Sequence, residues 1–423
     1  MGLRRIFADD LPRPIAGCHA VVADDLVVVG GLLATDYKTG IVPEAKGPSS
    51  LPSLNDSFAA QSKYVLRAAN TILDRAGCTF ADVVRIDQFI TERRVAAPYL
   101  RVRRAAFPLE KRPASTLITV PGLPVPLAAV SAEIIALAPG VTKKGIFTDR
   151  VPVNFPGVPH GVQAGDLVFV QGQIASDFRT PLAKEAQASP FWYETSMERQ
   201  TKYVIDNLAK ILEAADSSLD DVVKAHVYLT DLDNFQEFEA VWASRFRSNA
   251  PARTIIPVSS LGSPECKVEI NAIATRRNVS KRYIKAATAM QRDPLTESHA
   301  VRVGNWVFLS GLIAGNFETG IAGEAQVPAE APFFASEVER QLEFILKQAA
   351  LILAHSGSSL KHLVSAQAYL PRMTDYYAFA SAWRNALGSE LPCLTSVQIP
   401  NAGLCPESRI MLDLVGYCTS QSV

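Results

Sequence analysis

The sequence has no excess of either charge sign, because Lys and Arg number 42 among its 423 residues and Asp and Glu also number 42. A protein that binds duplex nucleic acid or an anionic membrane surface usually carries a basic excess. We therefore expect neither nucleic acid nor a membrane as a partner. The six cysteines have neither Cys-x-x-Cys spacing nor the density of a disulfide-stapled scaffold. They predict free thiols in the reducing cytoplasm.

Long unbroken apolar runs are also missing. Residues 1–17 carry charges but no apolar core of a secretory signal. The longest apolar stretch, residues 117–141, is interrupted by Pro121, Pro124 and Pro126 and carries the charged Glu133. Such a stretch predicts two buried strands joined by a turn and excludes a membrane span.

The chain is too long for one ordinary core, and at roughly 150 residues per domain it should hold nearly three domains. Three repeated segments support this division. His19, His160 and His299 each stand eleven residues before the end of an apolar run. A glycine follows each run, and the three are Gly31, Gly172 and Gly311. The copies lie 141 and then 139 residues apart.

Further segments keep the same offsets, for instance residues 72–91, 211–230 and 352–371. Three segments that hold their spacing without drift predict three tandem units. We place these units at residues 13–140, 151–277 and 291–420. Short polar linkers, residues 142–150 and 278–290, are expected between them.

Each unit is expected to have an α+β fold, and the middle copy illustrates its element order. The apolar residues of the stretch 194–215 recur at three- and four-residue spacing, which predicts an amphipathic helix. The full predicted order is β-β-α-β-α-β-β, with both helices on one face of a mixed sheet. The other face also carries apolar residues, so three such faces should bury one another around a common axis. The expected elements are a strand pair around Gly172, the helix 194–215, the strand 222–229, a second helix near 234–247, and the strands 254–258 and 267–275.

Two motifs of the middle copy carry a resemblance to a known family. The glycine-containing strand reads VFVQGQIA at residues 168–175, and the tail reads Pro251-Ala252-Arg253 followed by Lys267-Val268-Glu269-Ile270. These motifs resemble the RidA family, also called YjgF, whose members assemble as homotrimers of a chorismate-mutase-like fold. The resemblance implies three tandem RidA-like domains that form a pseudo-trimer with pseudo-threefold symmetry. It further implies a monomer or a dimer of such chains.

The resemblance also implies an activity. Family clefts between subunits hold small carboxylates, which the tail arginine binds, and the best-known reaction is hydrolysis of enamines and imines to keto acids and ammonia. Neither a metal nor a cofactor is implied. Because the middle copy has Arg253 where the others have Ser115 and Leu394, only one cleft should be complete.

That cleft is expected to contain both Arg253 and Glu269. We align Glu269 with Glu133 in the first copy and with Met411 in the third. In the resulting hypothesis Arg253 fixes the substrate carboxylate and Glu269 orients water and moves protons. Backbone groups near Gly172 or Gly311 are expected to assist. Ser310, Glu239 and His160 complete the candidate substrate-binding set.

The sequence departs from the family at several of these positions. Ile255 stands where a cysteine is common, and Gly17, Val158 and Glu297 stand where an aromatic residue is common. These departures predict a different substrate from that of a housekeeping imine deaminase.

Two other functions remain open at this stage. Ring-opening amide hydrolases with serine–lysine pairs resemble triplicated relatives of this architecture, and Lys63 and Lys202 repeat at 139 residues, although without repeating serine partners. A non-catalytic pseudo-trimer that binds a small acid is the second alternative. The repeated histidines are expected to be buried structural residues rather than metal ligands, with general-base participation near the cleft still open. His226, His355 and His362 are expected at the surface.

Overall fold

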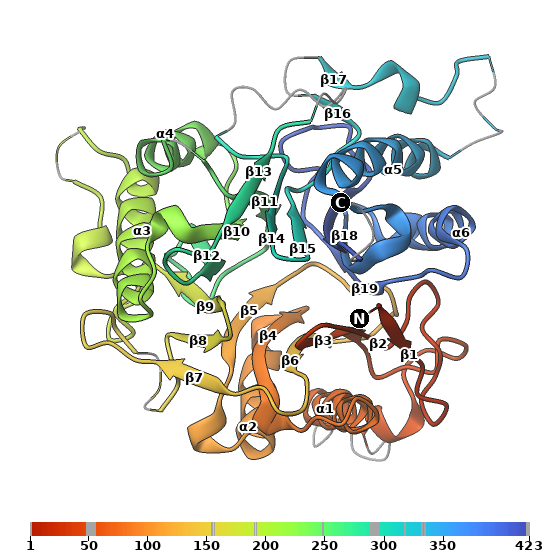
Figure 1. Cartoon of the computed structure of the whole chain (residues 1–423), viewed down its shortest axis with the longest axis horizontal. Helices are drawn as coiled ribbons and strands as arrows, with labels where there is room; N and C mark the ends of the chain where they lie inside the picture. The colour runs from red at the N-terminus through yellow and green to blue at the C-terminus, as the bar shows by residue number, and fades with distance from the viewer. Residues whose placement is uncertain are drawn as a thin grey trace.

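The computed structural model comprises three consecutive α+β units, each with a six-stranded mixed sheet and two long helices (Figure 1). In Figure 1 the helices lie at the periphery and the sheets face the middle of the molecule. The structure describes residues 2–47, 56–153, 155, 157–189, 191, 193–247, 249–286, 296–316, 319–330, 333 and 336–419. The predicted limits 291 and 420 of the third unit fall outside these residues.

The first unit shows the topology that all three units share. Its strand order is β1-β2-β3-β6-β4-β5, and β4 and β5 are parallel whereas the other neighbours are antiparallel. The elements are β1 (Arg4–Ile6), β2 (Ala20–Ala23), β3 (Leu26–Leu32), α1 (Ser57–Arg75), β4 (Val83–Ile90), α2 (Ala96–Ala106), β5 (Ala114–Thr119) and β6 (Val130–Leu137).

The other two units repeat this order. The second unit contains β7 (Lys143–Ile146), β8 (Gly161–Ala164), β9 (Leu167–Ile174), α3 (Ser196–Ala214), β10 (Val222–Leu229), α4 (Phe235–Arg245), β11 (Ala252–Pro257) and β12 (Val268–Thr275). The third contains β13 (Lys281–Ile284), β14 (Ala300–Val303), β15 (Trp306–Leu309), α5 (Glu337–Ser356), β18 (Leu363–Leu370), α6 (Tyr376–Leu387), β19 (Cys393–Gln398) and β20 (Met411–Tyr417). A small ribbon of β16 (Gly315–Asn316) and β17 (Gly320–Ile321) follows β15.

Local sequence signals explain the helices and strands well. Helix α3 begins after Thr195, whose side chain accepts a hydrogen bond from the backbone N–H of Glu198 while the Glu198 carboxylate accepts from the Thr195 N–H. This capping box satisfies two donors that the first turn would otherwise leave unpaired. The predicted helix 194–215 and strand 222–229 are confirmed as α3 and β10. The apolar stretch 117–141 spans the end of β5, the loop and β6, as expected.

The predicted linkers contain structure that the sequence did not suggest. Lys143–Ile146 forms β7, which pairs with β8, and Lys281–Ile284 forms β13, which pairs with β14. Each unit therefore starts with an extra edge strand, and the sheet of the second unit begins at Lys143 rather than near residue 151. The segments are short and polar, so only pairing with the next strand makes them extended.

A core shared by all three sheets holds the units together. One buried apolar cluster draws residues from each unit, for example Val28, Phe169 and Phe308. Burial of apolar surface contributes roughly 25 cal/mol per Å², so a shared core favours the assembled chain over separate units. The expectation that the inner sheet faces bury one another is confirmed.

Equivalent contacts join consecutive units at three seams. The last parallel strand of one unit lies against the glycine-containing strand of the next, and the third unit closes on the first. The strand pairs are β5 with β9, β11 with β15, and β19 with β3. Among the described residues, no helix is long and apolar enough to cross a membrane.

Candidate active site

Strand register corrects the alignment of the tail acids. Glu133 pairs across the sheet with Asp87, Asn271 with His226, and Asp413 with Gln367. Glu133 therefore corresponds to Asn271, and the counterparts of Glu269 are Ser131 and Met411. The prediction that Glu133 matches Glu269 is wrong by two residues. Since side chains two apart on a strand point to the same face, the error leaves the face unchanged. Glu133 accepts hydrogen bonds from Gln367 and Thr395 of the third unit.

The three glycines show which residues meet at each seam. A Cβ atom placed on Gly172 would lie 2.0 Å from Glu269 Oε1, so the absence of a side chain leaves the space that the carboxyl group occupies. Each glycine also faces a threonine of the preceding unit. The sets are Gly172 with Glu269 and Thr116, Gly311 with Met411 and Thr254, and Gly31 with Ser131 and Thr395.

Arg253 and Glu269 consequently lie at different seams, and the prediction that they share one cleft is wrong. Arg253 leaves β11 and lines the seam between the second and third units together with Gly311 and Met411. Glu269 lines the seam between the first and second units together with Ser115. Each cleft is built from two consecutive units, so the arginine and the acid of one copy face opposite neighbours.

The Arg253 guanidinium is held by protein groups. Its Nη1 lies 2.7 Å from Glu239 Oε2, its Nε donates to Glu297 Oε2 at 3.2 Å, and its Cζ lies 4.8 Å from the ring centroid of Trp242. The residue is 1% exposed, and burial lowers the pKa of Arg253. The cavity beside it measures only about 30 Å³. Nη2 of Arg253 has no hydrogen-bond partner among the described residues. Two carboxylates already offset its charge, however, and so small a cavity leaves little room for a third.

The other residues predicted for this cleft hold the seam closed. Ser310 Oγ accepts a hydrogen bond from the Arg253 N–H at 2.8 Å and donates one to Ser298 O at 2.6 Å. Gly311 N–H donates to Arg253 O at 3.0 Å. Glu239 also accepts from the Thr296 N–H at 2.7 Å. The contacts of Arg253 and Glu239 join the second unit to the third.

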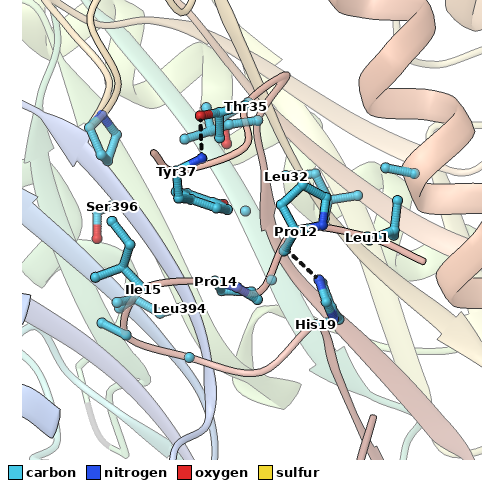
Figure 2. A pocket seen from close by; sticks show the side chains of 18 of the residues that line it. Leu11, Pro12, Pro14, Ile15, His19, Leu32, Thr35, Tyr37, Leu394 and Ser396 are labelled. Atoms are coloured by element: carbon cyan, nitrogen blue, oxygen red, sulfur yellow. Dashed lines mark hydrogen bonds between the residues drawn. The ribbon is translucent and has the colours of Figure 1, made fainter. Parts of the chain in front are cut away.

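The seam between the third and first units is mainly apolar. Figure 2 shows Leu394, Ile15 and Tyr37 around its small cavity of about 50 Å³. His19 also lines it, but its Nδ1 accepts from the Ala8 N–H and its Nε2 donates to Pro12 O. Burial lowers the pKa of His19, so the ring is neutral near pH 7. No arginine, lysine, aspartate or glutamate lines this cavity within the described part of the chain.

The seam between the first and second units contains a cavity of about 580 Å³. We call it the Glu269 cleft. Glu269 and Gly172 of the second unit line one wall, and Arg103 and Ser115 of the first unit line the other. This volume is in the usual range for small-molecule sites.

Glu269 has unusual electrostatics in this cleft. The residue is 5% exposed, and the carboxyl group makes no hydrogen bond or ion pair with any described residue. Burial, with a smaller contribution from the negative charge of Asp87, raises the pKa of Glu269 to about 8. The carboxyl group is therefore largely protonated at neutral pH and can donate a proton as well as accept one.

Arg103 supplies the cation that the strand position lacks. It lies on α2, and its Nη1 donates to Ser115 Oγ at 2.5 Å and to Gln88 Oε1 at 2.6 Å. Ser115 stands at the position that Arg253 has in the second unit. The guanidinium has thus moved from the strand to the facing helix. No described carboxylate lies within ion-pair distance of Arg103.

The two glutamates that hold Arg253 have apolar counterparts here. The helix position of Glu239 is Leu100 in the first unit, and the position of Glu297 is Val158 in the second. Both residues line the Glu269 cleft. Because neither can accept a hydrogen bond with its side chain, they leave the Arg103 guanidinium available to an anion.

Arg103 was not among the residues predicted from the sequence, although a signal existed. At the 139-residue offset Arg103 aligns with Trp242, and the third copy has Trp383 there. The first copy has no arginine at the strand position but has one at this helix position. This pattern indicates that the helix supplies the guanidinium in place of the strand. Two further arginines that were not predicted, Arg93 and Arg179, also line the cleft.

The histidines play structural parts. His160 is buried and its Nε2 donates to Val151 O at 3.1 Å, and it does not line the Glu269 cleft. The prediction that His226 lies at the surface is wrong, because it is buried with Nε2 3.1 Å from Asp413 Oδ2. The repeated histidines lie in three separate units. Across the described ranges, no group of three or more His, Cys, Asp and Glu residues could hold a metal ion.

The lysines of the amide-hydrolase alternative lie outside the cleft. Lys202 Nζ is 2.5 Å from Glu194 Oε1 on the partly exposed face of α3. Lys63 lies on α1 and borders a surface groove. Neither lines the Glu269 cleft, so this alternative gains no support from the geometry.

The fold and the site define an α+β protein of three like units whose clefts are shared between consecutive units. The chain belongs to the family described as Endoribonuclease L-PSP, whose profile matches three times, over residues 15–138, 156–276 and 294–410. The predicted RidA family, with three tandem domains, is thereby confirmed.

Individual relatives match about one unit each. The chain is 37% identical over 134 residues to a RutC family protein of Saccharolobus solfataricus, which covers 32% of this chain and 98% of the relative. It is 30% identical over 150 residues to Reactive Intermediate Deaminase A, chloroplastic, of Arabidopsis thaliana, which covers 36% of this chain and 73% of the relative. The crystal structure of E. coli TdcF with bound serine is 31% identical, with a TM-score of 0.27, and covers 31% of this chain and 98% of that one.

Proposed function

We propose that the Glu269 cleft hydrolyses the C=N bond of a small imine, or of the enamine that is its tautomer, and releases ammonia. One observation carries the proposal: within the described part of the chain, a carboxyl group without a hydrogen-bond or ion-pair partner and a guanidinium without a carboxylate line the same cavity of about 580 Å³. Further support comes from the relative that is named a reactive intermediate deaminase. Among the residues that the structure describes, no comparable pair lines the cavities at the other two seams.

Arg103 is proposed to bind the substrate carboxylate. A guanidinium offers planar, paired N–H donors that match a carboxylate, and a hydrogen bond between charged groups contributes roughly 1.5–3 kcal/mol. Ser115 Oγ and Gln88 Oε1 both accept hydrogen bonds from Nη1 of the guanidinium and so orient its remaining donors. Orientation of this kind places the reacting carbon close to the acid and lowers the entropic cost of reaction.

The chemistry then needs only Glu269 and water. Protonated Glu269 donates its proton to the imine nitrogen, which gives an iminium ion. The carboxylate accepts a proton from water as the water oxygen bonds to the iminium carbon. Glu269 next protonates the amine, and its carboxylate takes the hydroxyl proton as the C–N bond breaks. One water is consumed, a 2-keto acid and ammonia leave, and Glu269 is protonated again.

One chain is proposed to be sufficient for this site. Both walls of the cleft belong to the same chain, because Arg103 and Glu269 are residues of a single sequence. The remaining seams then serve as structural joints, and no second chain is needed to close the cleft. We therefore expect a monomer to be active.

The test measures ammonia release from 2-iminobutyrate that an amino acid oxidase generates in situ. Glu269→Gln should lower the enzyme-dependent rate about 100-fold or more, as loss of a general acid–base does. Arg103→Ala should lower kcat/KM about 10- to 100-fold, mainly through KM. The matched control is Arg101→Ala, because Arg101 is an exposed arginine of the same helix whose partner Asp56 is 3.8 Å away. It should stay within about twofold of wild type.

A rate no faster than buffer for the wild type would overturn the proposal. Ligand binding that requires Arg103 but has no turnover would instead favour the small-acid-binding alternative. A full rate in Glu269→Gln would exclude the mechanism above.

A further inference from the structure

The Glu269 cleft has an uneven charge distribution. Within the described part of the chain, its charged lining consists of three arginines, Arg93, Arg103 and Arg179, and one acid, Glu269. No described lysine or aspartate belongs to the lining. A single substrate carboxylate would leave this cavity strongly positive.

Arg93 and Arg179 come from different units. Arg93 lies in the short 3-10 turn Arg93–Val95 that follows β4 in the first unit, and Arg179 lies in the loop after β9 in the second. The second and third units have Leu232 and Met373 at the position of Arg93. The cation is therefore specific to this cleft and is not required by the fold.

Neither arginine is neutralised by a described carboxylate. The nearby Glu92 pairs with Arg94 at 2.7 Å. Asp177, two residues before Arg179, accepts hydrogen bonds from the backbone N–H groups of Arg179 and Thr180 at 2.9 and 2.7 Å. It does not form an ion pair with the Arg179 guanidinium. Both arginines are exposed residues, and both line the cleft.

We propose that the substrate is a dicarboxylic acid imine, with one carboxylate on Arg103 and the second between Arg93 and Arg179 at the mouth of the cleft. This inference rests on the proposed function and names the substrate class of the same site. Two carboxylates would compensate most of the positive charge of the three arginines. Arginine is the side chain best suited to bind the carboxylate at each end of such a substrate.

The test separates ligand class from turnover by titration calorimetry with the full chain. The probes are the keto acids that the reaction would release, namely 2-oxoglutarate and oxaloacetate against 2-oxobutyrate and pyruvate. We expect the dicarboxylates to bind about 10-fold more tightly or better. Arg93→Ala and Arg179→Ala should each reduce that preference several-fold, and the double variant should abolish it. Arg101→Ala should keep it.

Equal affinity for the two classes, or a preference that survives in the double variant, would overturn the inference. Tighter binding of 3-phosphoglycerate than of either dicarboxylate would overturn the assignment of the second group as a carboxylate. Ammonia release is measured separately. If the protein prefers dicarboxylates but releases no ammonia, the proposed ligand class is supported and the proposed function is overturned. If it releases ammonia but shows no preference for dicarboxylates, the proposed function is supported and the ligand class is overturned.

Discussion

Glu269 is the residue whose position is hardest to explain by stability alone. A buried carboxyl group without a hydrogen-bond partner destabilises the fold, and most proteins pair such groups. Here the group faces a cavity and lies over Gly172, where any side chain would collide with it. Perturbed carboxyl groups in clefts are frequent at active sites. The arrangement therefore favours a chemical role over a structural one.

Activity and stability should both respond to the Glu269 proton. Its pKa is raised to about 8 in the folded chain from an ordinary value of 4.5, so kcat/KM should fall above pH 8. A raised pKa means that the folded state loses stability as pH rises from about 4.5 to 8. Glu269→Gln removes this loss. We expect its free energy of unfolding, measured by urea titration, to exceed that of the wild type by an amount that grows from pH 5 to pH 9, on the order of a few kcal/mol.

An equal difference in unfolding free energy at pH 5 and pH 9 would contradict this expectation. The exposed pair Asp216–Arg277 provides the control, because its atoms are 3.8 Å apart in solvent. Asp216→Asn should show almost no pH-dependent difference between pH 5 and pH 9.

Gly172 should also be necessary for full activity, because its lack of a side chain leaves room for the Glu269 carboxyl group. In Gly172→Ala the new Cβ atom would displace the Glu269 carboxyl group, because the ideal position lies 2.0 Å from Oε1. We expect ammonia release to fall about 10-fold or more, since small misplacements of a catalytic group are costly. Gly262→Ala is the matched control, because its Cβ would meet only Ile174 Cδ1 at 3.6 Å. Comparable losses of ammonia release in both variants would argue against displacement of the Glu269 carboxyl group as the cause.

At the scale of elements, the arginine of the seam comes from the strand in the second unit and from the helix in the first. In the second unit β11 supplies Arg253 and α4 supplies Trp242, which stack at 4.8 Å. In the first unit β5 supplies Ser115 and α2 supplies Arg103, which are hydrogen-bonded. The same two elements thus build a closed ion-pair cluster at one seam and an open cationic cleft at another. The backbone scaffold is kept while the site changes.

Arg253 should matter for folding and not for catalysis. Arg253→Met leaves Glu239 and Glu297 buried without their cation, so we expect a loss of about 3–5 kcal/mol in unfolding free energy. Adding Glu239→Leu and Glu297→Val introduces the residue types that stand at the corresponding positions of the Glu269 cleft. These substitutions should restore much of the lost unfolding free energy. Thermal unfolding measures both effects. Ammonia release per folded molecule should stay near wild type, and a specific loss of turnover in the triple variant would contradict this assignment.

At the scale of the whole molecule, the three sheets meet around a buried polar network. Asp413 of the third unit lies 2.6 Å from Lys224 Nζ of the second, and Asn271 of the second donates to Thr116 Oγ1 of the first at 2.9 Å. Burial alone would raise the pKa of Asp413, but Lys224 and His226 together lower it below its usual value. The network fixes how the units face one another.

Asp413→Asn should weaken the whole assembly. It leaves the buried ammonium of Lys224 without its counter-charge, so we expect a loss of about 3 kcal/mol or more in unfolding free energy. Because the pKa of Asp413 is lowered in the folded state, its contribution is present above about pH 4 and is lost only as pH falls further. The difference in urea midpoint should therefore be constant from pH 5 to pH 8. A difference that disappears at pH 5 would contradict this sign.

Much of the architecture follows from the sequence. The repeat of His19, His160 and His299 established three units, because residues at a fixed offset belong to equivalent places in like folds. The bounds of β10 and α3 agreed with local periodicity, which depends on neighbours a few residues away. The strands β7 and β13 were missed because their polar residues become extended only by pairing with another strand.

The sequence by itself determined the family, the number of units and the order of their elements, since these depend on local patterns and on the repeat. Only the tertiary structure decided which residues share a cleft. Arg253 and Glu269 belong to one copy but face opposite neighbours, while Arg103 and Glu269 are far apart in the chain and line one cavity. Such a cleft forms when two units pack together, and contacts between distant segments leave no periodic trace in either segment alone.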